Sequence, residues 1–437
     1  MGRADQGTED VQDKARRRAT TTESATGDAV VGVAPVAGET RDELWLTEPK
    51  NGAIRLDQAV AAAGKVGLQS IHLLAWRDLD DPEAGGSELH AHRIAALWAR
   101  AGLDITMRTS SAAGHEPFAQ RDGYRVVRKS GRYGVFPRSA LSGFVGRRGR
   151  PDGLVEIWNG MPFFSPLWAR CPRIVFLHHV HAEMWQMVMS PRLAPIGAFV
   201  ERRLAPPFYR RSRIVTLSSS SRQEIVSMLG LSPERVSVVP PGVDPRFSPG
   251  TQRSPDPLVV AVGRLVPVKR FDLLIDQLVA VRRDVPELRA QIIGEGYERP
   301  RLEAQIRAAG ASEWLQLVGR RTDDELLDAY RRAWVLVSTS QREGWGMTIT
   351  EAAACGTPAV VTRIAGHRDA VDDGVTGILV DNPDQFGNAL RGVLRDETQR
   401  RRLGRAALEH AARLTWEATA AGTLETLVAE AEARRHR

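Results

Sequence analysis

Residues 258–296 of the chain, LVVAVGRLVPVKRFDLLIDQLVAVRRDVPELRAQIIGEG, contain a complete strand–helix–strand unit. The apolar runs LVVAV and AQII are typical of buried strands, and FDLLIDQLVAVRRD between them is typical of a helix with one apolar face. A strand, a helix and a second strand in this order form a right-handed βαβ unit on a parallel sheet. The segment therefore predicts the α/β fold class.

The same alternation extends in both directions. Strand-like runs follow at WLQLVGR, WVLVSTS, TPAVVTR and TGILVD, and earlier ones are SIHLLAW, DITMRTSS, GYRVVRKS, DGLVEIWN, RIVFLHH, RIVTLSSS and RVSVVPPG. We expect two Rossmann-like, doubly wound parallel-sheet domains. Because ligands bind at the carboxyl ends of such strands, the predicted site is the cleft across which the two domains face each other.

A cluster of proline, glycine and serine at residues 247–257 separates the two series and is predicted to be a linker. The expected N-terminal domain then covers residues 46–246 and the C-terminal domain residues 258–410. Residues 1–45 show no apolar period and are predicted to be a disordered polar tail. Residues 411–437 are predicted to form a helix that packs back on the N-terminal domain.

The composition limits the classes of protein to which this chain can belong. The 437 residues are 42% hydrophobic and 26% charged, with no apolar run near the roughly 18 residues of a membrane span. The polar N-terminus has no signal-peptide core, and two distant cysteines suggest neither a disulfide framework nor a zinc site, so a cytoplasmic protein is expected. The net charge of +7, carried by arginine because there are only five lysines, suits a nucleotide, an anionic lipid or a nucleic acid.

The first candidate motif is GRLVPVKRFD, residues 263–272. Gly263 permits a tight turn after the strand, and Arg264 and Lys269 emerge from that turn before a helix. Arginine can bind a diphosphate through two hydrogen bonds and lysine supplies a point charge. A surface pair of cations at a helix start explains the spacing equally well.

The second motif is SQREGWGMTITEAAACGTPAVV, residues 340–361. Glu343 and Glu351 flank Gly344 and Gly346, and a helix is predicted from about Met347. Free N–H groups at a helix start bind anions, and a carboxylate one turn later can accept hydrogen bonds from ribose hydroxyls. We favour this function over two solvated glutamates beside a glycine turn.

Two segments of the N-terminal domain could complete the site. PEAGGSELHAHRIAALWARAG, from Pro82, places Gly85 and Gly86 directly after the first strand, where backbone can approach a ligand closely. FLHHVHAEMW, from Phe176, places His178 at the end of a strand. A metal site is disfavoured because further ligands are lacking. The DLD run at Asp78 is interpreted as an ordinary acidic turn.

Together these segments resemble a GT-B glycosyltransferase of the large retaining family known as GT4. EGWGMTITEAAACGTPAVV is similar to the family's E-x7-E signature and VGRLVPVKRFDLLI to its donor-phosphate segment. VVPPGVDPRFSP is similar to the passage into the second domain, and PEAGGSELHAHRIAALWARAG to the first glycine loop and helix. The resemblance covers about residues 70–420.

The resemblance implies a metal-independent enzyme that moves a sugar from a nucleoside-diphosphate sugar, UDP- or GDP-linked, to a hydroxyl acceptor on the N-terminal domain. It requires no cofactor. The implied catalytic residues are Arg264, Lys269, Glu343 and His178. The implied donor-binding residues are Gly85, Gly86, Gly263, Arg320, Gly344, Trp345, Gly346, Met347, Thr348 and Glu351. No covalent nucleophile is evident, so a front-face mechanism is expected, in which the leaving diphosphate deprotonates the acceptor.

Local departures from the family pattern concern substrate preference. Trp345 stands where phenylalanine is common, Thr348 and Thr350 replace apolar residues, and HHV at His178 replaces the more frequent His-Asp. These differences affect the choice of sugar and of acceptor.

Other functions remain open. The Arg-rich segments GRYGVFPRSALSGFVGRRGR, from Gly131, and ERRLAPPFYRRSR, from Glu201, could lie on an anionic membrane surface at the inner face, with a lipid acceptor. An ordinary covering helix with outward arginines is the favoured alternative. A non-catalytic nucleotide-sugar binder or an epimerase would share the fold. Nucleic-acid binding is not expected because no recognised module is present.

Overall fold

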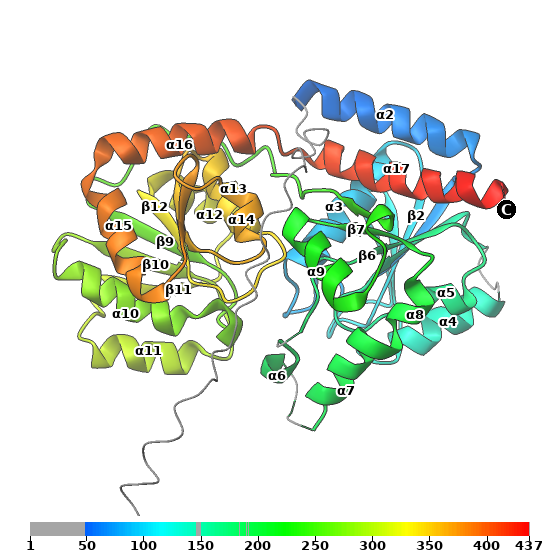
Figure 1. The fold of residues 1–437 in the computed structure, drawn as a ribbon, viewed down its shortest axis with the longest axis horizontal. Helices are drawn as coiled ribbons and strands as arrows, with labels where there is room; N and C mark the ends of the chain where they lie inside the picture. Colours follow the sequence, from blue (N-terminus) through cyan, green and yellow to red (C-terminus); the bar gives the residue numbers. More distant parts are fainter. Residues whose placement is uncertain (1–48, 146–149, 183, 189, 191, 437) are drawn as a thin grey trace, which may run out of the picture. The chain divides into compact units, whose positions relative to one another are not determined.

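The computed structural model describes residues 49–145, 150–182, 184–188, 190 and 192–436 (Figure 1). The predicted polar tail, residues 1–45, lies outside the described residues. The described residues belong to one compact unit, which contains two sheets. We call the part built on the first sheet the first lobe and the part built on the second sheet the second lobe.

Within the described residues, the first sheet has the strand order β3-β4-β2-β1-β5-β6-β7-β8, with every pair parallel except β3 and β4. Its strands are β1 (Ser70–Leu74), β2 (Asp104–Thr109), β3 (Phe118–Arg121), β4 (Tyr124–Arg128), β5 (Gly153–Ile157), β6 (Arg173–Phe176), β7 (Arg213–Thr216) and β8 (Val236–Val238). Its helices and helical turns are α2 (Pro49–Lys65), α3 (Gly86–Arg100), α4 (Val135–Val145), α5 (Ser165–Trp168), α6 (Met184–Val188), α7 (Ala194–Phe199), the π-helical turn η2 (Val200–Leu204), α8 (Pro206–Tyr209), α9 (Ser219–Leu229) and η3 (Pro233–Arg235).

The second sheet is parallel throughout, in the order β11-β10-β9-β12-β13-β14. Its strands are β9 (Leu258–Val262), β10 (Arg289–Ile293), β11 (Leu315–Gly319), β12 (Val335–Ser338), β13 (Ala359–Thr362) and β14 (Gly377–Val380). Its helices and turns are η4 (Pro267–Lys269), α10 (Phe271–Arg282), α11 (Arg299–Ala308), α12 (Asp323–Arg332), α13 (Met347–Ala354), α14 (His367–Ala370), η5 (Pro383–Gln385), α15 (Phe386–Arg395) and α16 (Glu397–Ala411).

The predicted alternation of strands and helices is confirmed in both lobes. Strand β9 is apolar along its length because helices cover both faces of the sheet, so its first four residues are buried. Helix α10 buries residues at helical spacing, including Phe271, Leu274 and Leu278. Strand β3 and helix α2 are among the elements that were not predicted. Strand β3 is a four-residue edge strand with exposed residues, and α2 begins at Pro49.

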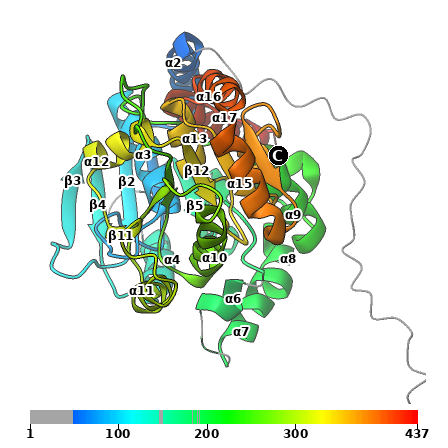
Figure 2. The same ribbon diagram turned by 90° about the vertical axis from the view of Figure 1, so that its left-hand side faces the viewer.

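Helix α17 (Trp416–Arg435) lies along α2 on the first lobe, although the chain has just left the second lobe (Figures 1 and 2). The indole N–H of Trp98 in α3 donates to the carbonyl of Ala420 at 3.0 Å. An ion pair between Arg55 and Glu425 joins α2 to α17. The C-terminal helix therefore completes the core of the first lobe.

Two chain connections run between the lobes and touch each other. Val243, in the forward connection, forms an isolated bridge with Thr415, in the return connection. A Cβ atom at Gly242 would lie 2.2 Å from the backbone nitrogen of Trp416, so only glycine fits there. The two connections therefore pack directly against each other.

Candidate functional site

The first strand of the second lobe leads into a turn that carries Lys269. After β9 the chain passes Gly263 and the turn η4 before α10 begins. The Thr339 hydroxyl, from the end of β12, donates to the carbonyl of Arg270 at 2.9 Å and holds the turn. A Cβ atom at Gly263 would be 3.4 Å from Cε of Lys269, so glycine leaves room for the lysine side chain.

Lys269 and Glu343 form an ion pair beside this turn. The Ser340 hydroxyl donates to the same carboxylate oxygen of Glu343 at 2.9 Å. The two charged side chains are only 21% and 18% exposed. Burial opposes the charge of Glu343, but nearby Lys269 outweighs it and holds the pKa of this carboxyl below its usual value. Glu343 is therefore charged at neutral pH.

The Glu343 loop enters helix α13 through two glycines. Gly346 has a φ of 105°, in the left-handed region that favours glycine. A Cβ atom at Gly344 would lie 3.0 Å from the carbonyl oxygen of His178 in the first lobe. Met347 and Thr348 then form the first turn of α13. The free N–H groups and the positive end of the helix dipole at this point can bind an anion.

Glu351 lies one turn further along α13, four residues after Met347. Its Oε2 atom accepts a hydrogen bond from the Tyr330 hydroxyl at 2.9 Å. Burial raises the pKa of Glu351 to about 7, although the bond from Tyr330 opposes that change. The carboxyl is consequently in the middle of its titration at neutral pH and can both donate and accept hydrogen bonds.

The first lobe presents its glycine loop, residues 82–86, to these groups. Arg264 and Arg320 each donate to a carbonyl oxygen of this loop, at 3.4 and 3.2 Å. A Cβ atom at Gly86 would lie 3.3 Å from Sδ of Met347, so the start of α13 meets the start of α3. The predicted cationic turn, the glycine–glutamate segment and the first glycine loop therefore come together.

The glycine loop is itself held by the first lobe. The N–H of Gly85 donates to Oε2 of Glu88 at 2.9 Å, and the Ser87 hydroxyl donates to the same oxygen at 2.8 Å. The Asn159 side-chain amide, from the end of β5, donates to the Ser87 hydroxyl at 3.0 Å. Buried Arg77 donates to the carbonyl of Glu83 at 2.7 Å. This network orients the loop before any ligand binds.

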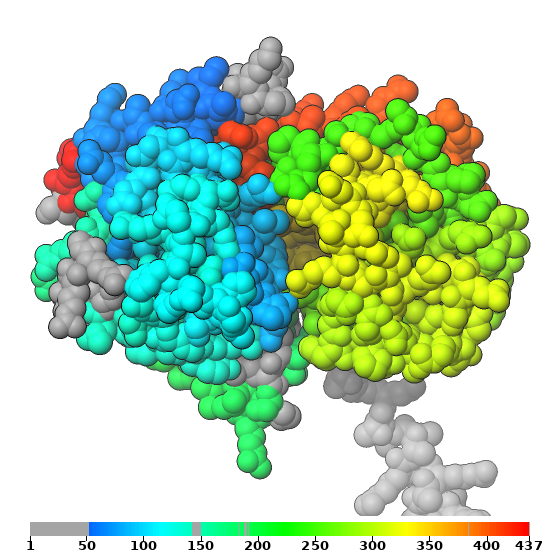
Figure 3. Space-filling view, turned by 180° about the vertical axis from the view of Figure 1, so that it is seen from behind, coloured from blue at the N-terminus to red at the C-terminus, as the bar shows by residue number. Residues whose placement is uncertain are grey.

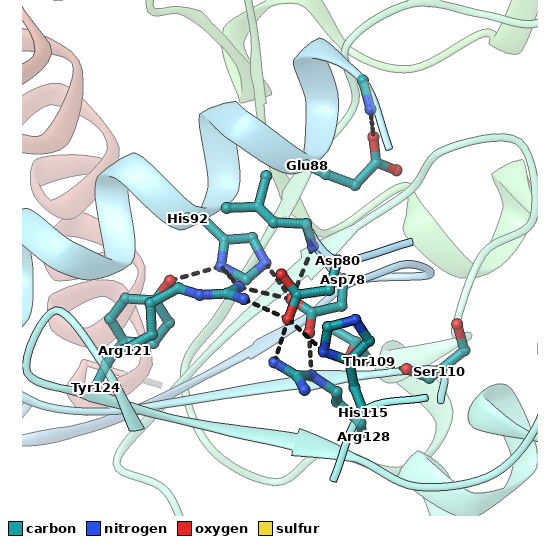
Figure 4. Close-up of polar contacts among 12 residues, drawn as sticks. Asp78, Asp80, Glu88, His92, Thr109, Ser110, His115, Arg121, Tyr124 and Arg128 are labelled. Atoms are coloured by element: carbon teal, nitrogen blue, oxygen red, sulfur yellow. Dashed lines mark hydrogen bonds and ion pairs between the residues drawn. The ribbon is translucent and has the colours of Figure 1, made fainter. Parts of the chain in front are cut away.

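Asp78 and Asp80 belong to an internal ion-pair cluster (Figure 4). Asp78 is fully buried, where Arg121 (2.8 Å), Arg128 and the ring of His92 surround its carboxylate. Burial opposes the charge of Asp78, but His92 and the arginines lower its pKa below the usual value. The cluster ties the loop after β1 to strands β3 and β4. In the described part of the chain, no group of three or more acidic, histidine or cysteine side chains could hold a metal ion.

His178 lies at the carboxyl end of β6 and is buried. The centroid of its ring lies 4.9 Å from that of Phe176 and 5.2 Å from that of His90. Among the described residues, neither of its ring nitrogens has a hydrogen-bond partner. Burial lowers the pKa of His178 well below its usual value, so the ring is neutral. Buried polar atoms without partners are rare and costly, so a bound ligand or an ordered water would stabilise this ring by hydrogen bonding to it.

The neighbouring His179 shows that the charged groups converge. Burial, followed by the positive charge of Arg342, lowers the pKa of His179 to about 4. Lys269 and Arg264 act in the same direction and Glu343 acts against them, so all four charges lie within electrostatic range of this ring. Buried Trp345, in the Glu343 loop, has an indole nitrogen that is also unpartnered among the described residues.

Several residues that shape the site were not predicted. Glu201, fully buried in the π-helical turn η2, accepts hydrogen bonds from the N–H groups of His181 (2.8 Å) and Ala182 (3.2 Å) and from the indole of Trp185 (2.9 Å). It therefore anchors the histidine segment. Its position as a single acid within the basic run ERRLAPPFYRRSR was a signal that could have found it.

Two direct links between the lobes were also missed. Arg342 donates to the carbonyl of Val180 at 2.9 Å and to Glu224 at 2.5 Å. Asp369 accepts from the N–H of Ser219 at 2.9 Å, at the start of α9. Each link joins residues more than 100 positions apart, so no local sequence pattern predicts it.

Comparison with known families identifies both halves of the chain. The family described as "Glycosyltransferase Family 4" matches residues 84–247, and "Glycosyl transferases group 1" matches residues 246–410. Among curated proteins, a D-inositol 3-phosphate glycosyltransferase of Kribbella flavida is 36% identical over 246 residues, which cover 50% of this chain and 58% of that protein. The protein of the same name in Nocardia farcinica is 26% identical and covers 85% of this chain and 90% of its own length. Most of these relatives are matched over little more than half of their length.

Solved structures share the fold. Sucrose-phosphate synthase from Thermosynechococcus elongatus superposes with a TM-score of 0.68 at 20% identity, over 80% of this chain and 96% of that one. The Anabaena protein HepE in complex with UDP and glucose superposes with a TM-score of 0.64 at 18% identity, over 83% and 99%. The expected two-lobed arrangement of parallel sheets is thereby confirmed.

Proposed function

Since the chain belongs to the group 1 glycosyltransferases of the GT-B fold, we propose that it transfers a sugar from a nucleoside-diphosphate sugar to an acceptor hydroxyl. The Lys269–Glu343 ion pair beside the start of α13 carries this proposal. There the cations, a carboxylate and free helix N–H groups meet at the carboxyl ends of β9 and β12. Such a site suits a diphosphate joined to a polar sugar.

We assign the residues as follows. Arg264 and Lys269 neutralise the leaving diphosphate, with Gly263 giving the lysine room. Glu343 and the backbone from Gly344 to Met347 hold the donor sugar and the adjoining phosphate. Glu351 binds the ribose, since a carboxyl that titrates near neutral pH can accept from one hydroxyl and donate to another. Further donor contacts come from Gly85, Gly86, Arg320, Trp345 and Thr348, and His178 binds the reacting sugar from the first lobe.

The reaction needs charge stabilisation more than covalent chemistry. When the anomeric C–O bond breaks, its electron pair moves to the diphosphate oxygen. The acceptor oxygen forms the new C–O bond on the same face of the sugar, and its proton passes to that diphosphate oxygen. Arg264, Lys269 and the helix start stabilise the negative charge as it develops, in a site largely closed to water. The configuration at the anomeric carbon is then retained.

The donor is proposed to carry uridine diphosphate, because HepE, which shares the fold, is described in complex with UDP and glucose. A GDP-linked donor is the second choice. The acceptor is a hydroxyl on a glycan, a lipid or a small metabolite. A phosphorylated inositol belongs among the first acceptors to try, since the curated relatives are named D-inositol 3-phosphate glycosyltransferases.

A thermal-shift screen with nucleotides and nucleotide sugars tests the donor assignment. A ligand at 100 times its Kd stabilises the fold by about 2.7 kcal/mol, which raises the melting temperature measurably. We expect a UDP-sugar to give the largest shift and the Lys269→Ala variant to lose most of it. If no nucleotide shifts the melting temperature, the donor site is wrong.

Product analysis with an acceptor panel separates transfer from the nearest rivals. A glycosyltransferase releases UDP in proportion to the glycosylated acceptor. An epimerase converts the nucleotide sugar without an acceptor, and a binding protein leaves it unchanged. The experiment uses a donor that binds tightly and a broad panel of acceptors. If either of those two outcomes is found, it replaces the proposal of sugar transfer.

A further inference from the structure

The outer face of the segment from α7 to α8 carries a row of large apolar side chains. The exposed fractions are 48% for Leu193, 56% for Ile196, 58% for Phe199, 42% for Leu204 and 40% for Phe208. We call these five residues the apolar ridge. Such exposure is unusual for one continuous segment, because soluble proteins rarely expose contiguous large apolar side chains without a partner.

Helix α7 has its large apolar side chains on the outer face, whereas a helix that covers a core has them on the inner face. Its buried residues are the small Ala194 and Gly197, whereas Ile196 and Phe199 point outward. No residue larger than glycine fits at position 197 on the inner face, because a Cβ atom there would lie 2.4 Å from the ring of Trp185. A covering helix would bury its large residues instead. Helix α7, which lies just before the Arg-rich segment that starts at Glu201, therefore does not have the pattern of a covering helix.

The ridge is surrounded by positive charge. Exposed arginines flank it at positions 192, 202, 203, 210 and 211, and within the described residues none of their guanidinium groups has a hydrogen bond or an ion pair. Between Met184 and Arg213 the sequence holds one acid, Glu201, which is buried inside the lobe. No negative charge of this segment therefore reaches the surface to offset the arginines.

The ridge projects from the first lobe near the candidate site. Figures 1 and 2 show α7 at the lower edge of that lobe, and the green segment stands out from the surface in Figure 3. Helix α6 contacts both α7 and the turn η4, which carries Lys269. A surface that bound the ridge would consequently lie close to the turn that carries Lys269.

We propose that the apolar ridge and its arginines dock the protein on an anionic phospholipid bilayer. The apolar side chains enter the boundary between headgroups and acyl chains, and the arginines bind lipid phosphates while their methylene stems lie on apolar surface. A second copy of the chain fits less well, because a two-fold contact through this face would bring ten unpaired arginines together. The proposal goes beyond the sugar-transfer reaction and does not depend on it.

Co-sedimentation of the full chain with vesicles tests the proposal. We expect binding to phosphatidylglycerol–phosphatidylcholine vesicles at low salt and little binding to pure phosphatidylcholine. Added salt should weaken binding, because the Debye length falls to about 10 Å at 0.1 M. A double substitution, Arg202→Gln with Arg203→Gln, should reduce vesicle affinity about thirtyfold, since each charge near an anionic surface contributes about fivefold.

A second variant, Ile196→Ser with Phe199→Ser, should reduce binding at least tenfold without lowering the melting temperature, because both side chains are already exposed. Matched controls remove equivalent groups elsewhere. Arg402→Gln with Arg405→Gln removes two exposed charges from α16, and Tyr297→Ser removes an aromatic ring that is 67% exposed. Both controls should bind vesicles as the wild type does.

Three results would overturn the proposal. The wild type could fail to bind anionic vesicles at low salt, or the ridge variant could bind as well as the wild type. Sedimentation velocity could instead show a dimer that the ridge substitutions dissociate, which would make a second copy the occupant. Donor binding, measured by thermal shift in the same variants, reports on the proposed reaction separately.

Discussion

Removing the charge of Lys269 should lower both the stability of the fold and the turnover of the enzyme, and the two losses can be measured separately. Lys269→Ala leaves Glu343 in a site where the charged side chains are about one-fifth exposed. Breaking a fully buried ion pair costs about 3–5 kcal/mol, so partial exposure sets the expected loss at about 2–3 kcal/mol. Loss of a group that stabilises the leaving diphosphate should lower kcat at least ~100-fold.

The stability loss should depend on pH. In the wild type the pKa of Glu343 is lower in the folded than in the unfolded protein. Ionised Glu343 therefore stabilises the folded state above the unfolded pKa, and this stabilisation is lost only as the pH falls through the folded-state pKa. Without Lys269, burial dominates and raises the pKa of Glu343. A carboxyl with a raised pKa destabilises the fold above its unfolded value and ceases to do so once protonated. The difference between wild type and variant should therefore shrink from pH 7 to pH 5.

A second substitution separates the two effects. Lys269→Ala combined with Glu343→Gln removes the unpaired charge and should recover most of the lost stability, whereas turnover should remain low. Urea unfolding at pH 7 and pH 5 measures the stabilities, and UDP release measures turnover. Lys65→Ala, an exposed lysine in α2, is the matched control. Turnover of Lys269→Ala within tenfold of wild type, or a stability loss that is the same at both pH values, would refute the reasoning.

Three further outcomes are expected. Glu351→Gln should be more stable than wild type above pH 7 and equally stable below about pH 4. The pKa of Glu351 in the folded protein is raised to about 7, so ionisation of this carboxyl destabilises the folded wild type increasingly as the pH rises above the unfolded pKa. Melting temperatures of both proteins across this pH range test the prediction. Gly344→Ala should lose about 1–3 kcal/mol through overpacking against a carbonyl oxygen of the first lobe, whereas Gly392→Ala, with open space in α15, should gain about 0.5–1 kcal/mol; equal denaturation midpoints would contradict this. Asp369→Ala should lower kcat/KM for the donor about three- to tenfold by removing the link to Ser219, and a wild-type value would contradict this.

The regular core of both lobes could be predicted from local patterns. A run such as LVVAV at β9 is apolar throughout because both faces of a parallel strand are covered, so its signal is strong and short-range. Strand β3, FAQR, was missed because an edge strand with exposed residues carries no apolar run. Helix α2 was missed because its stability depends on α17, about 370 residues away, as the Arg55–Glu425 pair shows.

The candidate site was predictable in its parts. Turns with glycine, lysine and glutamate follow strands, and parallel strands end at one edge, so Lys269 and Glu343 were expected near each other. Their direct pairing depends on how two loops fold toward one side, which spacing does not specify. The role of Glu201 is likewise tertiary, because its three donors come from a different segment.

The chain's sequence alone determined the alternation of strands and helices, the order of the motifs and the edge of each sheet where chemistry would gather. These features follow from short-range periodicity and backbone sterics, which act within a few residues. Only the tertiary structure decided that α17 completes the first lobe, that Arg342 and Asp369 join the lobes, and that α7 turns its large residues outward. Those outcomes depend on burial and charge between residues far apart, where the free energy of each contact exists only once the whole chain has packed.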